Sequence, residues 1–173
     1  MKLPGTNIVI NKTKDKLRLQ WCARLMTVNE PWISLGRDYD HSMKLLNDPL
    51  AELYFLSEND TPVGFVMIKL KGSFTGYIQI IAIDSPFRNQ GIGEAAIKFV
   101  ESEIFKISPN VFICVSSFNH RARNLYEKMG YELIGILKDY IVRGYDEILL
   151  RKTLGPLNTS GQTHLNFVKN GFR

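Results

Sequence analysis

The chain has 173 residues, 45% of them hydrophobic and 11% aromatic, which is enough for a single globular domain with its own core. Its 22 Lys and Arg residues against 17 Asp and Glu give a charge of +5 that is mild and scattered, which favours a small anionic ligand and argues against a nucleic-acid binder. No run approaches the roughly 18 to 20 apolar residues of a membrane span, and residues 1–7 lack the apolar segment of a secretion signal, so we expect a cytoplasmic protein.

The first half of the chain predicts two helices and four strands. Helices are predicted where apolar residues recur three or four positions apart, and strands where β-branched and aromatic residues are concentrated. In chain order the elements are a strand at 7–13, helices at 15–28 and 38–47, and strands at 53–56, 63–70 and 77–83. The last run is apolar on both faces, which predicts a central strand.

The second half continues the alternation of helices and strands. In chain order it predicts a helix at 91–106, a strand at 111–115, a helix capped by Asn119 and Gly130, and strands at 131–138 and 145–152 joined by a loop at 139–144. The whole order predicts a mixed α/β domain over residues 1–154, with an antiparallel start and one parallel crossover near its middle. Residues 155–173 are polar and aperiodic, and we interpret them as a C-terminal tail.

The junction after the fourth predicted strand carries a pattern typical of phosphate binding. Pro86 interrupts the strand, and glycines at 91 and 93 precede an amphipathic helix. Glycines let a ligand approach the backbone, and the unpaired N–H groups at a helix start favour an anion. Two glycines can also serve only to turn the chain, so on local grounds both interpretations stay open.

Two motifs, in this order, resemble those of the GNAT superfamily of acetyl-CoA-dependent N-acetyltransferases. The sequence Arg88-x-x-Gly91-x-Gly93 resembles the superfamily's pyrophosphate motif. The sequence Asn119-x-x-Ala122-x-x-Leu125-Tyr126-x-x-x-Gly130-Tyr131 resembles its second helix motif, in which Phe is common at the last position. With the element order, the resemblance covers about residues 7–153 and is nearest to the ribosomal-protein alanine N-acetyltransferases.

This resemblance implies a GNAT-type central sheet of about seven mostly antiparallel strands flanked by about four helices. It implies that acetyl-CoA lies in a splay between the fourth and fifth strands and acetylates a primary amine, on a peptide N-terminus or a small molecule. The residues implied to bind acetyl-CoA are Ile81, Ala82, Ile83, Arg88, Asn89, Gln90, Gly91, Ile92, Gly93, Glu94, Asn119, Ala122 and Tyr126. No metal, nucleic acid or membrane partner is expected, and the protein is expected to be a monomer or homodimer.

The resemblance also makes Tyr126 the general acid that protonates the leaving sulfur, although a tyrosine in an apolar helical stripe could serve only the core. Gln79 and Cys114 stand where related enzymes carry glutamates. The other possible bases are expected to be solvated or capping groups, namely Glu132, Asp139, Asp146, Glu147 and His120. No side chain is therefore named as the general base, and a chain of water molecules could take its place. The missing base also leaves an alternative function open, that of a regulatory module that binds acetyl-CoA without efficient catalysis.

An acceptor pocket is expected between the first helical pair and the last hairpin. Its predicted lining is Trp32, Arg37, Tyr39 and Asp40, with Tyr140 in the final loop. Trp32 could equally be a core residue. Cys22 and Cys114 lie in apolar segments without the spacing of a metal site, and both are expected to be reduced, buried thiols.

Overall fold

A computed structural model describes residues 1–157 and has the predicted α/β class. Across these residues it contains seven strands, four α-helices and one short 3₁₀ turn, in the order β1 (Val9–Lys12), α1 (Lys16–Thr27), α2 (Tyr39–Leu46), β2 (Ala51–Glu58), β3 (Thr61–Lys69), β4 (Tyr77–Ile83), the turn Ser85–Phe87, α3 (Ile92–Ile104), β5 (Asn110–Ser116), α4 (His120–Lys128), β6 (Glu132–Val142) and β7 (Tyr145–Thr153). Most of the predicted tail, residues 158–173, lies outside the described residues. Among the described helices, none is long and apolar enough to cross a membrane.

The strands form one sheet in the order β1-β2-β3-β4-β5-β7-β6. Strand β1 pairs antiparallel with β2, and β7 pairs antiparallel with both β5 and β6. Strand β4 pairs with β5 in parallel, through Tyr77 opposite Phe112 and Ile78 opposite Ile113. The antiparallel start and the parallel crossover are therefore confirmed, and the parallel pair is formed where both strands begin.

The chain divides into two compact units. Unit 1 contains residues 1–68 and 79–99, and unit 2 contains residues 69–78 and the chain from Val100 onward. The boundaries fall inside β3, β4 and α3, so each of these elements contributes to both units.

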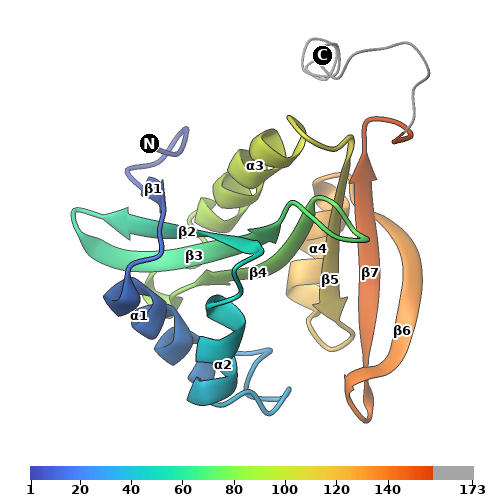
Figure 1. Cartoon of the computed structure of the whole chain (residues 1–173), viewed down its shortest axis with the longest axis horizontal. Coiled ribbons are helices and arrows are strands. Elements are labelled where there is room, and N and C mark those ends of the chain that lie inside the picture. Colours follow the sequence, from blue (N-terminus) through green and yellow to red (C-terminus); the bar gives the residue numbers. More distant parts are fainter. Residues whose placement is uncertain (158–173) are drawn as a thin grey trace. The chain divides into compact units, whose positions relative to one another are not determined.

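In unit 1, helices α1 and α2 cover one face of β2, β3 and β4 (Figure 1). Asp15 and Asp38 cap the two helices by accepting hydrogen bonds from the backbone N–H of Arg18 and His41. The core below them is apolar and contains Cys22, Met26, Trp32, Phe55, Phe65, Met67, Ile80 and Ala82. On the opposite face the Tyr54 ring meets Phe99 of α3, with centroids 5.5 Å apart, so the sheet of unit 1 is covered on both sides.

In unit 2, α4 begins directly after β5. The Asn119 side chain accepts a hydrogen bond from the Ala122 backbone N–H at 3.2 Å, which confirms Asn119 as an N-cap. Lys152 of β7 forms an ion pair with Glu101 of α3 at 2.8 Å and lies over the Tyr131 ring. These contacts pack α3 and the segment after α4 against the same face of β7.

The predicted loop at 139–144 is shorter in the structure, because β6 extends to Val142. Irregular pairing between Leu137 and Val142 accommodates the additional residues. Asp139 adopts a φ of 49° there, and its side chain accepts a hydrogen bond from the Gly144 N–H at 2.6 Å. The prediction that Tyr140 lies in a loop was therefore wrong: turn-forming residues at 139 and 144 mark a bulge and a tight turn.

Candidate active site

The turn between β4 and α3 is built from local hydrogen bonds of unit 1. Asp84 accepts a hydrogen bond from the Ser85 N–H at 2.7 Å and starts the 3₁₀ turn. Asn89 and Gly91 then adopt φ values of 64° and 75°, the left-handed region that glycine and asparagine tolerate best. Helix α3 starts at Ile92, so the predicted break and helix start are both observed.

The two glycines of this turn leave the backbone accessible. A Cβ built on Gly91 would have no atom within 4 Å, and one on Gly93 would meet only Ile83 Cγ1, at 3.8 Å. The first N–H groups of a helix have no intrahelical acceptor, and the helix dipole places positive charge there. The side of the turn where the two glycines lack a Cβ is therefore open, and it adjoins a helix start of the kind that binds anions.

Arg88 is held by contacts within unit 1 that sequence reasoning missed. Its Nε donates to the Ile83 carbonyl at 2.8 Å, and its Nη2 donates to Asn29 Oδ1. Asn29 in turn donates to the Leu25 carbonyl near the end of α1, at 2.7 Å. These two bonds from Arg88 use two of the five N–H donors of a guanidinium. Arg88 therefore ties the turn to α1, and nothing in its sequence motif indicated Asn29 as the partner.

The predicted residues on β4 also belong to unit 1. Ala82 is buried, whereas Ile81 and Ile83 are half-buried. A Cβ on Gly64 of β3 would collide with the Ala82 carbonyl at 2.3 Å, so the two strands approach closely at this point. Gln79 is half-buried, and its Oε1 is a buried acceptor without a hydrogen-bond donor among residues 1–157.

Unit 2 holds the predicted general acid. Tyr126 of α4 is 5% exposed, and its ring centroid lies 5.9 Å from that of Tyr131. Burial raises the pKa of Tyr126, so its phenol stays protonated at neutral pH. The structure thus provides a neutral hydroxyl in a buried site, which suits a proton donor and equally suits a core tyrosine.

A second group of polar side chains lies on β4, β5 and β7 of unit 2. The Tyr77 hydroxyl and the Cys114 thiol are hydrogen-bonded, and the Glu147 carboxylate acts on both. The Ser116 hydroxyl donates to Glu147 Oε1 at 2.6 Å. Burial, then Cys114 and Glu147, raise the pKa of Tyr77, and burial raises that of Cys114.

This group corrects two expectations. Glu147 was expected to be solvated or capping, but it is only 4% exposed, because β5 pairs beside it and brings Ser116 opposite. Cys114 was expected to be buried, but it is half-buried, whereas Cys22 is buried as predicted. The other possible bases differ from Glu147: Glu132, Asp139 and His120 are exposed, and Asp146 is half-buried.

The residues predicted to bind the acceptor divide between the units. In unit 1, Trp32 is 8% exposed and belongs to the core below α1 and α2, Arg37 and Tyr39 are half-buried, and Asp40 is exposed. In unit 2, Tyr140 is 67% exposed on β6. The burial of Trp32 favours its interpretation as a core residue.

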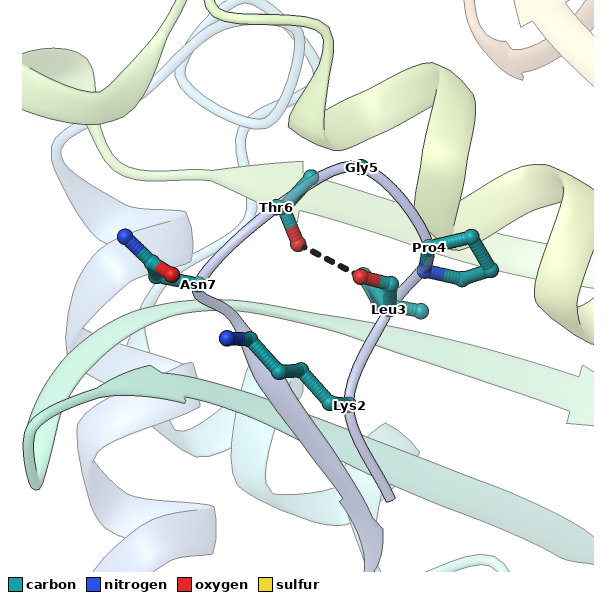
Figure 2. Close-up of a pocket in the computed structure, with 6 residues that line it drawn as sticks. All are labelled: Lys2, Leu3, Pro4, Gly5, Thr6 and Asn7. Carbon is teal, nitrogen blue, oxygen red and sulfur yellow. Dashed lines mark hydrogen bonds between the residues drawn. The ribbon is translucent and has the colours of Figure 1, made fainter.

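A further pocket is lined by residues 2–7 at the start of the chain. Figure 2 shows that one loop forms it and that the Thr6 hydroxyl donates across the loop to the Leu3 carbonyl, at 3.0 Å. None of the predicted site residues lies there, and the loop is closed by its own hydrogen bonds.

Sequence comparison identifies relatives of the chain. A profile of the acetyltransferase (GNAT) family matches residues 16–131. An N-alpha-acetyltransferase of Sulfurisphaera tokodaii is 26% identical over 115 residues, which cover 58% of this chain and 69% of that protein. N-alpha-acetyltransferase 30 of Dictyostelium discoideum is 34% identical over 84 residues, which cover 48% of this chain and 44% of that protein. The match therefore spans less than half of the Dictyostelium relative.

Solved structures share the fold. The ribosomal-protein-S18-alanine N-acetyltransferase of Escherichia coli superimposes with a TM-score of 0.70 at 16% identity, over 90% of this chain and 99% of that one. An aminoglycoside 6'-N-acetyltransferase complexed with coenzyme A also gives 0.70 at 16% identity, over 87% and 99%. The predicted architecture of seven strands and four helices is thus that of known acetyltransferases.

Proposed function

Since the chain belongs to the acetyltransferase (GNAT) family and is an acyltransferase that uses acetyl-CoA, we propose that its acceptor is the α-amine of a peptide or protein N-terminus. Both sequence relatives described above carry the name N-alpha-acetyltransferase. The E. coli neighbour is likewise named for acetylation of a ribosomal protein's alanine. A small-molecule amine is the second candidate, supported by the likeness to the aminoglycoside enzyme.

We further propose that residues 88–94 hold the pyrophosphate of acetyl-CoA. The observation that carries this proposal is the open space at Gly91 and Gly93 beside the start of α3. Arg88, fixed by Ile83 and Asn29, would keep the turn in shape and add positive charge. The backbone of residues 81–83 would bond the acetyl carbonyl and the pantetheine arm, and Asn89, Gln90, Asn119 and Ala122 would complete the contacts.

In the proposed reaction, acetyl-CoA supplies a thioester carbonyl that the neutral amine attacks. Backbone N–H groups stabilise the charge that develops on the carbonyl oxygen. Tyr126, whose raised pKa keeps it protonated, donates its proton to the departing sulfur. Arg37, Tyr39 and Tyr140 are proposed to contact the acceptor, and Trp32 belongs to the core against which Tyr39 packs. A cytoplasmic location and a monomeric or homodimeric state stay predictions from the sequence.

The test is a panel of acceptors presented with acetyl-CoA while thiol release is measured. The panel contains a peptide with a free α-amine, the same peptide with a blocked N-terminus and a free lysine, a polyamine and an aminoglycoside. We expect kcat/KM to be highest for the free α-amine and lost when it is blocked. Preference for the polyamine or the aminoglycoside would replace the proposed acceptor with a small molecule.

A further inference from the structure

Asn29 connects the end of α1 with the turn before α3, and it is a polar residue with only 9% of its surface exposed. Its side-chain amide donates to the Leu25 carbonyl at 2.7 Å, and its Oδ1 accepts a hydrogen bond from Nη2 of Arg88. Its backbone N–H donates to the Met26 carbonyl, and its own carbonyl accepts from the Ile33 N–H, both at 3.3 Å. Asn29 is therefore bonded both to the turn and to the residues that follow α1.

Residues 29–38, which connect α1 to α2, form a connecting segment with its own hydrogen bonds. The N–H groups of residues 35–37 each donate to a carbonyl earlier in the segment, at 3.0 Å. The Glu30 carboxylate accepts from the N–H and the hydroxyl of Ser34, at 3.2 and 3.0 Å. Because these bonds join one part of the segment to another, order at its first residue is passed along to its end.

The far end of the connecting segment carries residues that are proposed to contact the acceptor. Arg37 lies in its last turn, and Tyr39 is the first residue of α2. Trp32 and Leu35 fix the middle of the segment in the core, at 8% and 7% exposed, whereas Ile33 between them is 52% exposed. The segment thus joins the turn before α3 at one end and the proposed acceptor contacts at the other.

Arg88 provides the contact through which a bound phosphate acts on Asn29. Its side chain is exposed, and it uses two of the five N–H groups of a guanidinium, toward the Ile83 carbonyl and toward Asn29. A guanidinium forms charge-assisted hydrogen bonds with phosphate oxygens. A long arginine side chain loses conformational freedom when it is fixed. An anion that fixes Arg88 therefore removes part of the cost of forming its bond to Asn29.

We propose that Asn29 is a positioning residue that makes the binding of acetyl-CoA and of the acceptor amine mutually favourable. The inference rests on the proposed function, because it takes residues 88–94 as the pyrophosphate site and Arg37 and Tyr39 as acceptor contacts. Acetyl-CoA on the turn orders Arg88, Arg88 holds Asn29, and Asn29 holds the connecting segment in its hydrogen-bonded form. The acceptor then meets an ordered segment and binds more tightly than to the free enzyme. Such coupling is reciprocal, so each ligand raises the affinity for the other by the same factor.

Amide hydrogen exchange of the connecting segment, measured with and without coenzyme A, tests the link from the turn to the segment. The N–H groups of residues 35–37 exchange when their internal hydrogen bonds open. We expect saturating coenzyme A to slow this exchange by at least about fivefold in the wild type, the low end of typical coupling between sites. Protection of residues 88–94 shows that the turn is occupied. An occupied turn with unchanged exchange at residues 35–37 would overturn the proposal.

Two substitutions separate the bond to Arg88 from the bond to Leu25. Asn29→Ala removes both, whereas Asn29→Asp loses the amide donor and keeps an acceptor for Arg88. With coenzyme A saturating for each variant, protection of residues 35–37 should vanish in Asn29→Ala and persist in Asn29→Asp. A structural role at the end of α1 predicts the same loss in both variants, which would overturn the proposal. Asn47→Ala removes an equivalent bond at the end of α2 and should keep the protection.

The link to the acceptor is tested with coenzyme A and the amine of the panel that gives the highest kcat/KM. Coenzyme A has no acetyl group to transfer, so the ternary complex does not react and its calorimetric Kd is measured with and without the amine. We expect the amine to lower this Kd by at least about fivefold in the wild type and by less than about twofold in Asn29→Ala. An equal effect of the amine in both proteins would overturn the proposal.

If Asn29→Ala does not fold, Arg88→Lys takes its place, because Arg88 is exposed and lysine keeps the positive charge without the planar fork of donors. Arg88→Lys should bind coenzyme A without protecting residues 35–37, and protection equal to that of the wild type would overturn the proposal. Failure of coenzyme A to protect residues 88–94 of the wild type would refute the pyrophosphate site together with this inference. Absence of turnover by the wild type with every amine of the panel would instead refute the proposed function.

Discussion

The side chain of Arg88 donates a hydrogen bond to the side chain of Asn29, 59 residues earlier in the chain. Arg88 comes from the turn before α3, and Asn29 follows the end of α1. The two residues join the turn before α3 to the helical layer of unit 1.

This contact predicts that Asn29→Ala weakens acetyl-CoA binding although Asn29 is outside the turn. Losing one hydrogen bond to a charged group should cost about 1.5 kcal/mol, or roughly tenfold in Kd. Asn47→Ala is the control, because Asn47 also donates to a carbonyl four residues earlier, at 2.7 Å, and has no contact with Arg88 among the hydrogen bonds of residues 1–157. Calorimetric Kd values that are equal for both variants would show that the hydrogen bond from Arg88 to Asn29 does not contribute to acetyl-CoA binding.

Tyr126→Phe should lower kcat much more than acetyl-CoA affinity, because it removes only the proposed proton donor. A positioned acid contributes about 10² to 10⁴ in rate, and a thiolate leaves well enough to favour the smaller figure. Tyr131→Phe removes a hydroxyl from the adjacent ring and should leave kcat unchanged. Turnover of Tyr126→Phe within about threefold of wild type, with the melting temperature preserved, would make Tyr126 a core residue.

The Lys152–Glu101 ion pair should matter more for stability than the exposed pairs. Glu101 is 5% exposed, so Lys152→Met leaves a buried carboxylate without its cation, at a cost of about 3 kcal/mol. Lys98→Met breaks an exposed pair with Glu94 and should cost less than about 0.5 kcal/mol. Urea titration of both variants measures the difference, and equal free energies of unfolding would contradict the burial argument.

The buried thiol of Cys22 predicts a loss of stability at alkaline pH. Burial raises its pKa in the folded protein, whereas the unfolded thiol titrates near pH 8.5. Above that pH the unfolded state releases a proton that the folded state retains, so the free energy of unfolding falls as pH rises. Cys22→Ala should flatten this part of the profile between about pH 8.5 and 10. If the free energy of unfolding of Cys22→Ala falls with pH as steeply as that of wild type, other groups cause the loss of stability at alkaline pH.

The sequence predicted best where local chemistry decides the structure. The strand at 77–83 and the N-cap at Asn119 depend on neighbouring residues, and both are observed. The loop at 139–144 was predicted from turn-forming residues, but cross-strand pairing with β7 keeps Val142 in the strand.

Long-range contacts account for what sequence reasoning missed at the site. Alternation along β7 fixes which residues share the face of Glu147, but not whether that face is covered. Glu147 accepts a hydrogen bond from Ser116, 31 residues away, and Arg88 donates one to Asn29, 59 residues away. Neither partner has a local pattern that would identify it.

The calorimetric Kd of acetyl-CoA for Gly93→Val tests the proposed acetyl-CoA site most directly. Gly93 has an ordinary backbone conformation and open surroundings, so the substitution should leave the circular dichroism spectrum near that of wild type, whereas Gly91→Val adds backbone strain at its φ of 75°. Gly135→Ala, in equally open space on β6, is the control. We predict that Gly93→Val abolishes measurable binding because its side chain fills the position of the pyrophosphate. An unchanged Kd in folded Gly93→Val would contradict the placement of acetyl-CoA on this turn.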